Sequence, residues 1–174
     1  MPFAVSMSGI CKRFGAVTAN DHIDLNVLSG DIHGIVGENG AGKSTLVSIL
    51  YGFYTADSGT TEIAGIPYTH NTPADSIAAG IGMVHQHFML VPNFTVLENI
   101  ILGHEGYKQL SKSMDQARHM LSSLSQQYGL DVDLDAQVGD LPVSLQQRVE
   151  ILKALYRDAR ILILDEPTGV LTPQ

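Results

Sequence analysis

The sequence predicts an α/β protein whose core is a parallel β-sheet, and three observations predict it. Short aliphatic runs typical of strands alternate along the chain with stretches of helical spacing. One run, at 31–37, leads through a glycine-rich loop directly into a helix. Another, "ILILD" at 161–165, is continuously aliphatic up to its final Asp, as in strands that are buried on both faces of a parallel sheet.

Local signals place the elements in order. The helix after the glycine-rich loop starts at Lys43, carries apolar residues at spacings of three and four, and stops at Gly52. Pro73 opens a short second helix. The alternating "HIDLNV" predicts a strand at 22–27, and "DSGTTEIAGIPY" predicts turn-rich β structure. The other expected elements are a strand at 81–86, helical segments at 93–103 and 113–130, and a long helix that begins near 141.

Composition limits the possible classes of function. The 174 residues suffice for one domain, and no aliphatic run approaches the ~20 residues of a membrane-spanning helix. A net charge of -8 argues against general nucleic-acid binding, which needs clustered Lys and Arg. The single cysteine, Cys11, excludes an intramolecular disulfide and a cysteine-rich zinc site, and it is expected to be a small buried apolar residue. The N-terminus does not have the pattern of a secretory signal, so a cytosolic location is expected.

The stretch "GENGAGKST" has the form G-x-x-x-x-G-K-[ST], with a predicted strand before it and a predicted helix after it. Glycines allow successive backbone N–H groups to turn toward phosphates, and the helix N-terminus adds partial positive charge. Lys43 is expected to reach the β- and γ-phosphates, and the Ser44 hydroxyl to coordinate Mg²⁺. The alternative is a glycine-rich turn that binds nothing, and the flanking elements favour nucleotide binding. The predicted phosphate loop consists of Gly37, Glu38, Asn39, Gly40, Ala41, Gly42, Lys43, Ser44 and Thr45.

Asp165 and Glu166 complete the predicted site at the end of the aliphatic strand. In proteins with such a loop, an acid in the position of Asp165 holds Mg²⁺ through water, which leaves Glu166 free to act on the attacking water. The alternative is that "DEPTG" is only a turn after a strand. The glycine loop upstream favours the catalytic interpretation.

Three stretches point to a family: "VHQHFMLVPNFTVLENI", "QQRVEILKALYR" and "ILILDEPTGVLTPQ". With the glycine loop, they make the sequence resemble the ATP-binding subunits of ABC transporters over nearly its whole length. Within that family it is similar to the first nucleotide-binding module of bacterial importers for nucleosides and simple sugars. The resemblance implies a P-loop NTPase fold, with an ABC-type ATPase core, an antiparallel β subdomain and a helical insertion. It implies one module over 1–174, with a core at 1–93 and 151–174 and a helical subdomain at 94–150.

The resemblance also implies roles for single residues. Phe14, in "KRFGAV", takes the place of the aromatic that stacks on adenine. Gln86 matches a glutamine that senses the γ-phosphate and Mg²⁺ and couples to the membrane subunits. Asp165 matches the Mg²⁺-holding aspartate, and Glu166 matches the catalytic base. His85 and His87 flank Gln86 but have no third ligand cluster nearby in the sequence, so they are expected to be loop histidines rather than metal ligands.

The signature segment departs from the family pattern Leu-Ser-Gly-Gly-Gln. In the family its serine hydroxyl and glycine amides grip the γ-phosphate of ATP that is held by the opposite subunit. Pro142 has neither a hydroxyl nor an N–H, and losing a hydrogen bond to a charged group weakens such a contact by about ten- to a hundredfold. The hypothesis is that this signature serves the weaker of two composite sites, which predicts that restoring Ser and Gly changes the ATPase rate of the assembly. The segment reads Leu141, Pro142, Val143, Ser144, Leu145 and Gln146.

The helix after the signature segment is expected to persist. Ser144 and Gln147 have the spacing of a capping box. An apolar stripe follows, with charged residues outside it. The stripe is Leu145, Val149, Leu152 and Tyr156, and the outside residues are Arg148, Glu150 and Lys153.

The family core continues past "GVLT" at 169–172 to another strand and a histidine that contacts the γ-phosphate, and this chain stops first. The expectation is therefore a C-terminally truncated module that binds nucleotide with little turnover of its own, because losing a positioned catalytic group costs ~10²–10⁴-fold in rate.

The implied cofactors are ATP and Mg²⁺. The implied partners are transmembrane permease subunits, a second ATP-binding module arranged head to tail as a homo- or heterodimer, and indirectly an extracytoplasmic solute-binding protein, with no nucleic acid. The implied location is the cytoplasmic side, peripheral on the inner face of the plasma membrane. Two alternatives stay open: an inert fragment, and a non-transport ABC ATPase. A GTPase or small-molecule kinase lacks its guanine-reading Asn-Lys-x-Asp or Arg-rich lid here.

Overall fold

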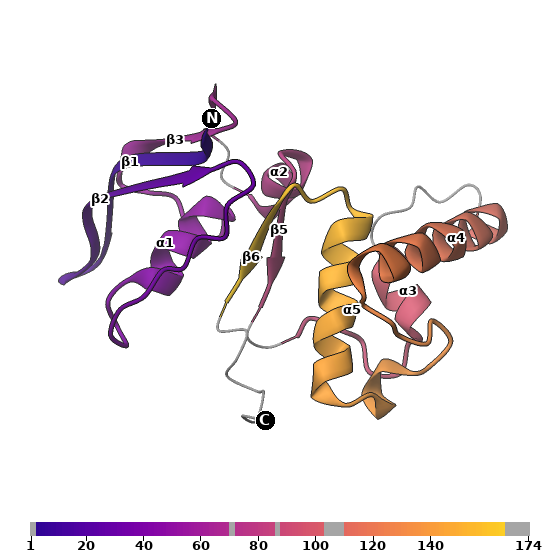
Figure 1. The fold of residues 1–174 in the computed structure, drawn as a ribbon. Coiled ribbons are helices and arrows are strands. Elements are labelled where there is room, and N and C mark those ends of the chain that lie inside the picture. The colour runs from indigo at the N-terminus through magenta and orange to yellow at the C-terminus, as the bar shows by residue number, and fades with distance from the viewer. Residues whose placement is uncertain (1–2, 70–71, 86–87, 103–109, 166–174) are drawn as a thin grey trace. The chain divides into compact units, whose positions relative to one another are not determined.

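The computed structural model describes residues 3–69, 72–85, 88–102 and 110–165, with the backbone alone for 110–113. It divides into two compact units, Met1–Ile81 and Gly82–Gln174. The elements of each unit are labelled in Figure 1.

The first unit contains a four-stranded antiparallel sheet. Its strands are β1 (Phe3–Phe14), β2 (Val17–Leu28), β3 (Ser58–Ile63) and β4 (Ile66–Pro67), in the order β2-β1-β3-β4. Every pairing between them is antiparallel. The predicted strand at 22–27 is therefore the second half of a longer strand, and the predicted turn-rich β segment is confirmed as β3 and β4.

Two helices belong to the same unit: α1 (Lys43–Leu50) and α2 (Pro73–Ala78). Both predicted helix starts, Lys43 and Pro73, are confirmed. Gly52, which follows the first helix, has φ 84, and a Cβ there would lie 2.7 Å from the Thr72 carbonyl, so a side chain has neither the conformation nor the space. The buried hydrophobic residues of the unit include Val5, Met7 and Ile10 of β1 and Leu46, Ile49 and Leu50 of α1.

Residues 31–37 do not form the predicted strand. Ile32 is 103% exposed and Val36 is 95% exposed. The aliphatic pattern indicates that a segment can fill a sheet, but a strand also needs a neighbour for its N–H and C=O groups. In the described part of the chain, neither sheet includes this segment.

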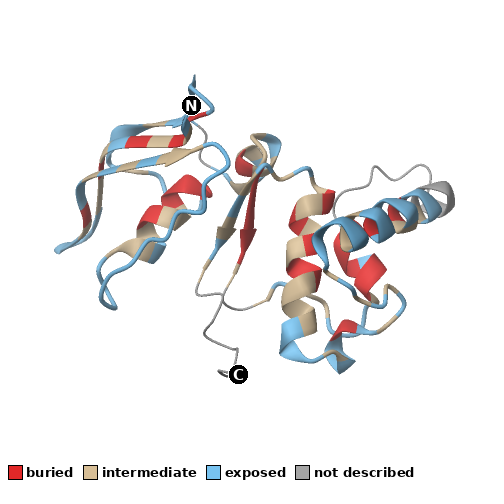
Figure 2. Ribbon diagram, in the orientation of Figure 1, coloured by how far each residue is buried: buried red, intermediate tan, exposed pale blue. Residues whose placement is uncertain are grey.

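The second unit holds a pair of strands and a group of helices. The strands are β5 (Ile81–Val84), which starts at the last residue of the first unit, and β6 (Ile161–Leu164). The two strands run in the same direction (Figure 1), as a parallel sheet requires. All four residues of β5 are buried, but Leu162 and Leu164 of β6 are 37% and 43% exposed, so the expectation of burial on both faces is wrong for β6 (Figure 2).

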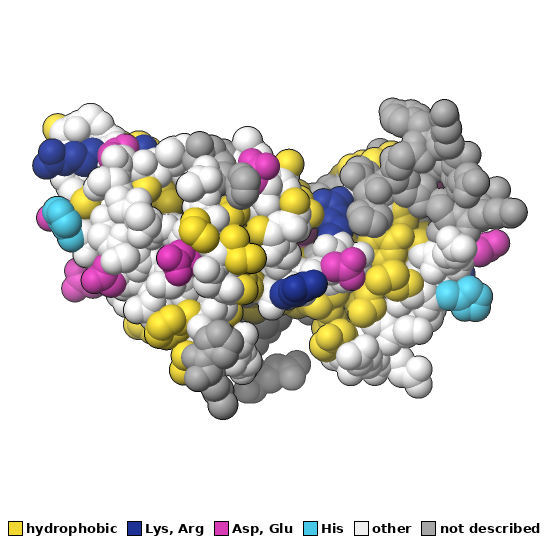
Figure 3. Space-filling view, turned by 90° about the horizontal axis from the view of Figure 1, so that it is seen from above, with side chains coloured by type: hydrophobic (Ala, Val, Ile, Leu, Met, Phe, Trp, Pro, Cys, Tyr) yellow, Lys and Arg dark blue, Asp and Glu magenta, His cyan; other side chains and the backbone are white. Residues whose placement is uncertain are grey.

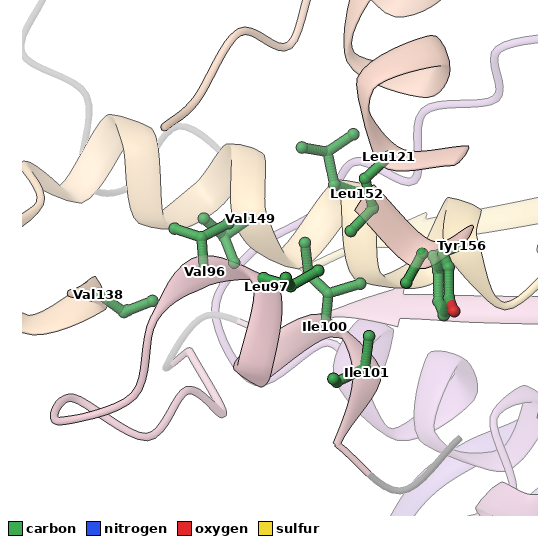
Figure 4. Packing of buried hydrophobic residues seen from close by; sticks show 10 residues of the cluster. Val96, Leu97, Ile100, Ile101, Leu121, Val138, Val149, Leu152 and Tyr156 are labelled. Carbon is green, nitrogen blue, oxygen red and sulfur yellow. The ribbon is translucent and has the colours of Figure 1, made fainter. Parts of the chain in front are cut away.

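The helices of this unit are α3 (Val96–Ile101), α4 (Leu110–Tyr128), the short 3₁₀ helix η1 (Val138–Asp140) and α5 (Val143–Tyr156). α3 begins with a capping box, in which the Thr95 side chain accepts from the Glu98 N–H and the Glu98 carboxylate accepts from the Thr95 N–H. The three α-helices share one hydrophobic cluster (Figure 4), in which Val149 of α5 lies against Val96 of α3. The buried members are Val96, Leu97, Ile100, Ile101, Ala117, Leu121, Val138, Val149, Leu152 and Tyr156.

Two details of α5 differ from expectation. The helix starts at Val143, with Pro142 in the N-cap position and no side-chain cap. Ser144 is thus the second helical residue, and the predicted capping box is wrong because a capping serine must precede the helix. The apolar stripe is confirmed at Val149, Leu152 and Tyr156, but Glu150, expected outside, is only 4% exposed.

No helix among the described residues is both long and apolar enough to cross a membrane. On the face shown in Figure 3, the Lys and Arg side chains of the described residues occur in small separate groups among hydrophobic and acidic ones.

The helical cluster predicts the effect of truncating one of its central side chains. Leu152→Ala removes a side chain that is 0% exposed, and we expect the free energy of unfolding to fall by about 2–5 kcal/mol because a cavity replaces packed contacts. The measurement is urea unfolding followed by circular dichroism. Met120→Ala, at a position 41% exposed, is the control and should change the value by no more than about 0.5 kcal/mol. Equal effects of the two substitutions would contradict the assigned core.

Candidate nucleotide site

The glycine loop leads into α1 and holds the Lys43 side chain, features that suit the predicted phosphate binding. Gly40 and Gly42 both have φ 83, a left-handed conformation that favours glycine. The Lys43 ammonium lies within the loop, where it donates to the Gly37 carbonyl at 2.7 Å and the Glu38 carbonyl at 2.8 Å. An ammonium has three donors, so these two bonds hold the charge inside the loop and leave capacity for a further acceptor. The loop ends at the N-terminus of α1, whose first turn presents N–H groups.

The end of the loop is fastened to the antiparallel sheet at Gly42. A Cβ on Gly42 would lie 2.0 Å from the Ala19 carbonyl oxygen, so only glycine permits this approach to β2. The next residue of β2, Asn20, is 4% exposed and donates from its side-chain amide to the Gly42 carbonyl at 3.2 Å. In the described part of the chain the Asn20 Oδ1 atom has no hydrogen-bond partner. Sequence analysis did not identify Asn20, because nothing in its local pattern links it to a loop 22 residues later.

Phe14 is the last residue of β1, and its ring is 43% exposed. The Tyr54 ring meets it edge to face with centroids 5.1 Å apart, and the Lys12 ammonium lies 5.5 Å from the Phe14 centroid. Asp57 fixes this end of the strand: it accepts from Lys12 Nζ at 2.9 Å and from the Arg13 N–H at 2.7 Å. The bond from Lys12, followed by that from Arg13, holds the pKa of the Asp57 carboxyl below its ordinary value. Phe14 is thus presented at the surface on an anchored strand end.

Of the two predicted acids, the structure describes Asp165, which follows β6. Asp165 is half-buried, and its N–H donates to the Val84 carbonyl of β5 at 3.1 Å, which extends the pairing of the two strands by one residue. His85, which follows β5, is partly buried, and burial lowers its pKa against the opposing effects of Glu150 and Asp165. Gln86, His87 and Glu166 lie outside the described residues.

The signature segment leads into α5 without a side-chain cap. The Pro142 carbonyl accepts from the N–H groups of Leu145 at 2.9 Å and Gln146 at 3.0 Å, which begins the helix. The Gln146 side chain donates to the Leu141 carbonyl at 2.9 Å and closes the segment back on itself. Val143 is 41% exposed, so an apolar side chain stands at the surface of this turn.

Cys11 is half-buried rather than buried, and it lies at an irregularity in the pairing of β1 with β2. Its sulfur accepts from the His22 N–H at 3.2 Å. One possible ligand atom from each of Cys11, Asp21 and His22 lies within 4.8 Å of the others. Asp21 and His22 are exposed and already pair with each other at 2.8 Å, and we assign no metal to them.

The fold and the loop together define a class: a glycine loop that opens a helix, beside an antiparallel sheet, with a separate cluster of helices and a strand that ends in an acid, is the make-up of an ATP-binding cassette. The family model described as ABC transporter matches residues 20–169. The chain therefore belongs to the ABC transporter family.

Relatives of known name are similar along nearly the whole chain. A glucose import ATP-binding protein of Haloferax volcanii is 48% identical over 99% of this chain and 36% of its own length. A nucleoside import ATP-binding protein of Lactococcus lactis is 50% identical over 97% of this chain and 33% of its own length. A ribose import ATP-binding protein of Burkholderia thailandensis is 47% identical over 99% of this chain and 34% of its own length. The chain thus spans about a third of the length of these relatives.

Solved structures support the same fold. A nucleotide-free ATP-binding cassette from an ABC transporter aligns with a TM-score of 0.82 and 28% identity, over 97% of this chain and 71% of the other. The ADP conformation of another such cassette aligns with a TM-score of 0.85 and 27% identity, over 99% of this chain and 72% of the other.

Gly42 and Gly40 provide a matched pair of substitutions. Both have φ 83, but a Cβ meets an atom 2.0 Å away only at Gly42 and nothing within 4 Å at Gly40. Each change to alanine costs roughly 1–2 kcal/mol for the left-handed conformation. We expect Gly42→Ala to lower the free energy of unfolding clearly further than Gly40→Ala, as measured by urea unfolding. Equal losses would show that the loop does not depend on its contact with β2.

Asn20 predicts an effect on nucleotide affinity through the shape of the loop. Asn20→Ala removes the donor to the Gly42 carbonyl, and a net hydrogen bond of about 0.5–1.5 kcal/mol corresponds to roughly a three- to tenfold weaker binding of ATP. Isothermal titration calorimetry measures the dissociation constant for ATP. Asn26→Ala is the control, because Asn26 lies on the same strand and its side-chain Oδ1 accepts a hydrogen bond from the Ser6 hydroxyl at 2.8 Å, away from the glycine loop. The prediction is wrong if both variants bind ATP like the parent chain.

Proposed function

We propose that the chain is an ATP-binding module that energises import of a nucleoside or simple sugar across the plasma membrane. The observation that carries this proposal is the loop at 37–45, with its left-handed glycines and the Lys43 ammonium held within it. Relatives named as glucose, nucleoside and ribose import proteins support the cargo class.

In this proposal the nucleotide is ATP. The phosphates lie against the backbone N–H groups of residues 37–45, with Lys43 at the β- and γ-phosphates. Phe14 stacks on the adenine, for which its anchored position and exposed ring are suited.

The proposed ligands of Mg²⁺ are a hydroxyl, an amide oxygen and a carboxylate. They belong to Ser44, Gln86 and Asp165, the last acting through water. Oxygen ligands of this kind fit a hard cation such as Mg²⁺, which when bound would neutralise charge on the phosphates. Glu166 acts as the base toward the attacking water, and Gln86 assists by sensing the γ-phosphate.

A second module is proposed to complete the site. Head-to-tail pairing sets the segment from Leu141 to Gln146 against the γ-phosphate of ATP on the partner, and Pro142 makes that contact weak because it supplies neither N–H nor hydroxyl. Residues 94–150 are proposed as the helical subdomain that transmits closure, and 1–93 with 151–174 as the core. The further partners are permease subunits and, indirectly, an extracytoplasmic solute-binding protein. The module therefore works at the inner face of the membrane.

Two other functions can be distinguished from the proposed one by binding experiments. An inert fragment would not co-purify with permease subunits. A non-transport ABC ATPase acting on nucleic acid would bind DNA or RNA, which the net charge of -8 disfavours.

The proposal predicts magnesium-dependent ATP binding that depends on Lys43. We expect Lys43→Ala to weaken ATP binding about ten- to a hundredfold, because charged hydrogen bonds contribute about 1.5–3 kcal/mol. Calorimetric titration with ATP and Mg²⁺ measures this. Arg118→Ala is the control for charge, since Arg118 pairs with Asp135 at 2.6 Å on an exposed part of the second unit. Undiminished binding by Lys43→Ala would refute the assigned loop.

A further inference from the structure

The loop that follows β5 is held by side chains at two alternating residues. At Met89, the N–H donates to the Glu150 carboxylate at 2.8 Å and the carbonyl accepts from Lys153 Nζ at 3.0 Å. At Val91, the N–H donates to Asn99 Oδ1 at 2.7 Å and the carbonyl accepts from Asn99 Nδ2 at 3.0 Å. Both backbone groups of each residue are therefore fixed, one residue by α5 and the other by α3.

The attachment at Met89 uses two charged side chains, one of which, Glu150, is buried. Glu150 is 4% exposed, and Lys153 lies 3.9 Å from it with 17% of its side chain exposed. Burial lowers the pKa of Lys153, and the charge of Glu150 opposes that shift. A buried carboxylate is expensive unless it is hydrogen-bonded and paired, and these contacts supply both conditions. The attachment at Val91, by contrast, uses one neutral amide that is 1% exposed.

The Met89 attachment connects two segments that are each close in sequence to a different part of the proposed site. Met89 is three residues after Gln86, and Glu150 and Lys153 lie on the helix that starts directly after Pro142. The contacts join positions 61 and 64 residues apart. A rigid helix that makes two charged hydrogen bonds to one loop residue moves that residue with it, whereas packing contacts alone allow the residue to slide.

We propose that Glu150 and Lys153 are positioning residues that tie Met89, three residues after Gln86 in the sequence, to α5, so that a displacement at the signature segment reaches Met89. This inference rests on the proposed function for its consequence, but the attachment itself is a property of the second unit alone. Neither residue is assigned a contact with nucleotide. Asn99 holds the next part of the loop to α3 independently.

The first measurement is amide hydrogen exchange by NMR on the chain without nucleotide. We expect Glu150→Ala to speed exchange at the Met89 N–H about ten- to a hundredfold, the range for a hydrogen bond to a charged group. The Val91 N–H should keep its protection, because Asn99 still holds it, and this shows that the unit remains folded. Glu150→Gln keeps an acceptor oxygen and should have a smaller effect. Glu62→Gln makes the same chemical change on an exposed strand residue and should have none.

The second measurement is turnover in the complex with the proposed membrane subunits and second module. We expect Glu150→Ala and Lys153→Met to lower kcat about tenfold while the KM for ATP stays the same, because the phosphate loop is untouched. General destabilisation would instead lower the protection of Met89 and Val91 together.

The inference is overturned if Met89 exchange is unchanged in Glu150→Ala, or if kcat is unchanged although Met89 exchange accelerates. Failure of the chain to bind ATP would refute the proposed function and leave the Met89 result to decide the attachment.

Discussion

The first unit depends on the absence of a side chain at Gly42. The loop carbonyl and α1 can approach β2 only because a Cβ, which would lie 2.0 Å from the Ala19 oxygen, is missing there. Asn20 then bonds the Gly42 carbonyl from a buried position. This contact sets where the helix begins, and the helix start sets where Lys43 places its charge. The rigid partner is the antiparallel sheet, so the anchored end of β1 with Phe14 belongs to the same framework as the phosphate loop.

In the second unit, side chains of two helices hydrogen-bond the backbone of the loop after β5. Its loop after β5 has backbone groups that would be costly to leave unpaired away from water. They are paired not with a neighbouring strand but with Glu150, Lys153 and Asn99. The loop is thus held to two helices that are themselves joined by the apolar cluster of Figure 4. In both units, side chains from distant segments fix loop backbone: Asn20 does so at Gly42, and Glu150, Lys153 and Asn99 do so at Met89 and Val91.

Local signals predicted the parts of the fold whose cause is local. The helix at Lys43 and the helix at Pro73 follow from glycine and proline conformations and from helical spacing, so the sequence alone sufficed for both. The phosphate-binding role of residues 37–45 stays a prediction. The prediction of a strand at 31–37 was wrong because a strand needs a neighbouring strand to pair with, and an aliphatic pattern does not reveal whether one is present. Glu150 was expected outside because it is charged, yet Met89 and Lys153 satisfy its carboxylate inside. Asn20 went unnoticed for the same reason: its partner is a backbone carbonyl in another element.

The start of α5 shows that a helix forms directly after a segment that departs from the family signature pattern. Proline at position 142 has φ -56, which suits the start of a helix, and its carbonyl accepts the first helical hydrogen bonds. Helix packing through Val149 and Leu152 is then independent of what the signature segment offers to a phosphate. A proline there cannot donate an N–H, so the segment retains the dipole of the helix and loses specific donors. In the proposed head-to-tail pair, a weak contact at this segment is therefore compatible with an intact helix, and α5 still bonds the loop after β5 at Met89.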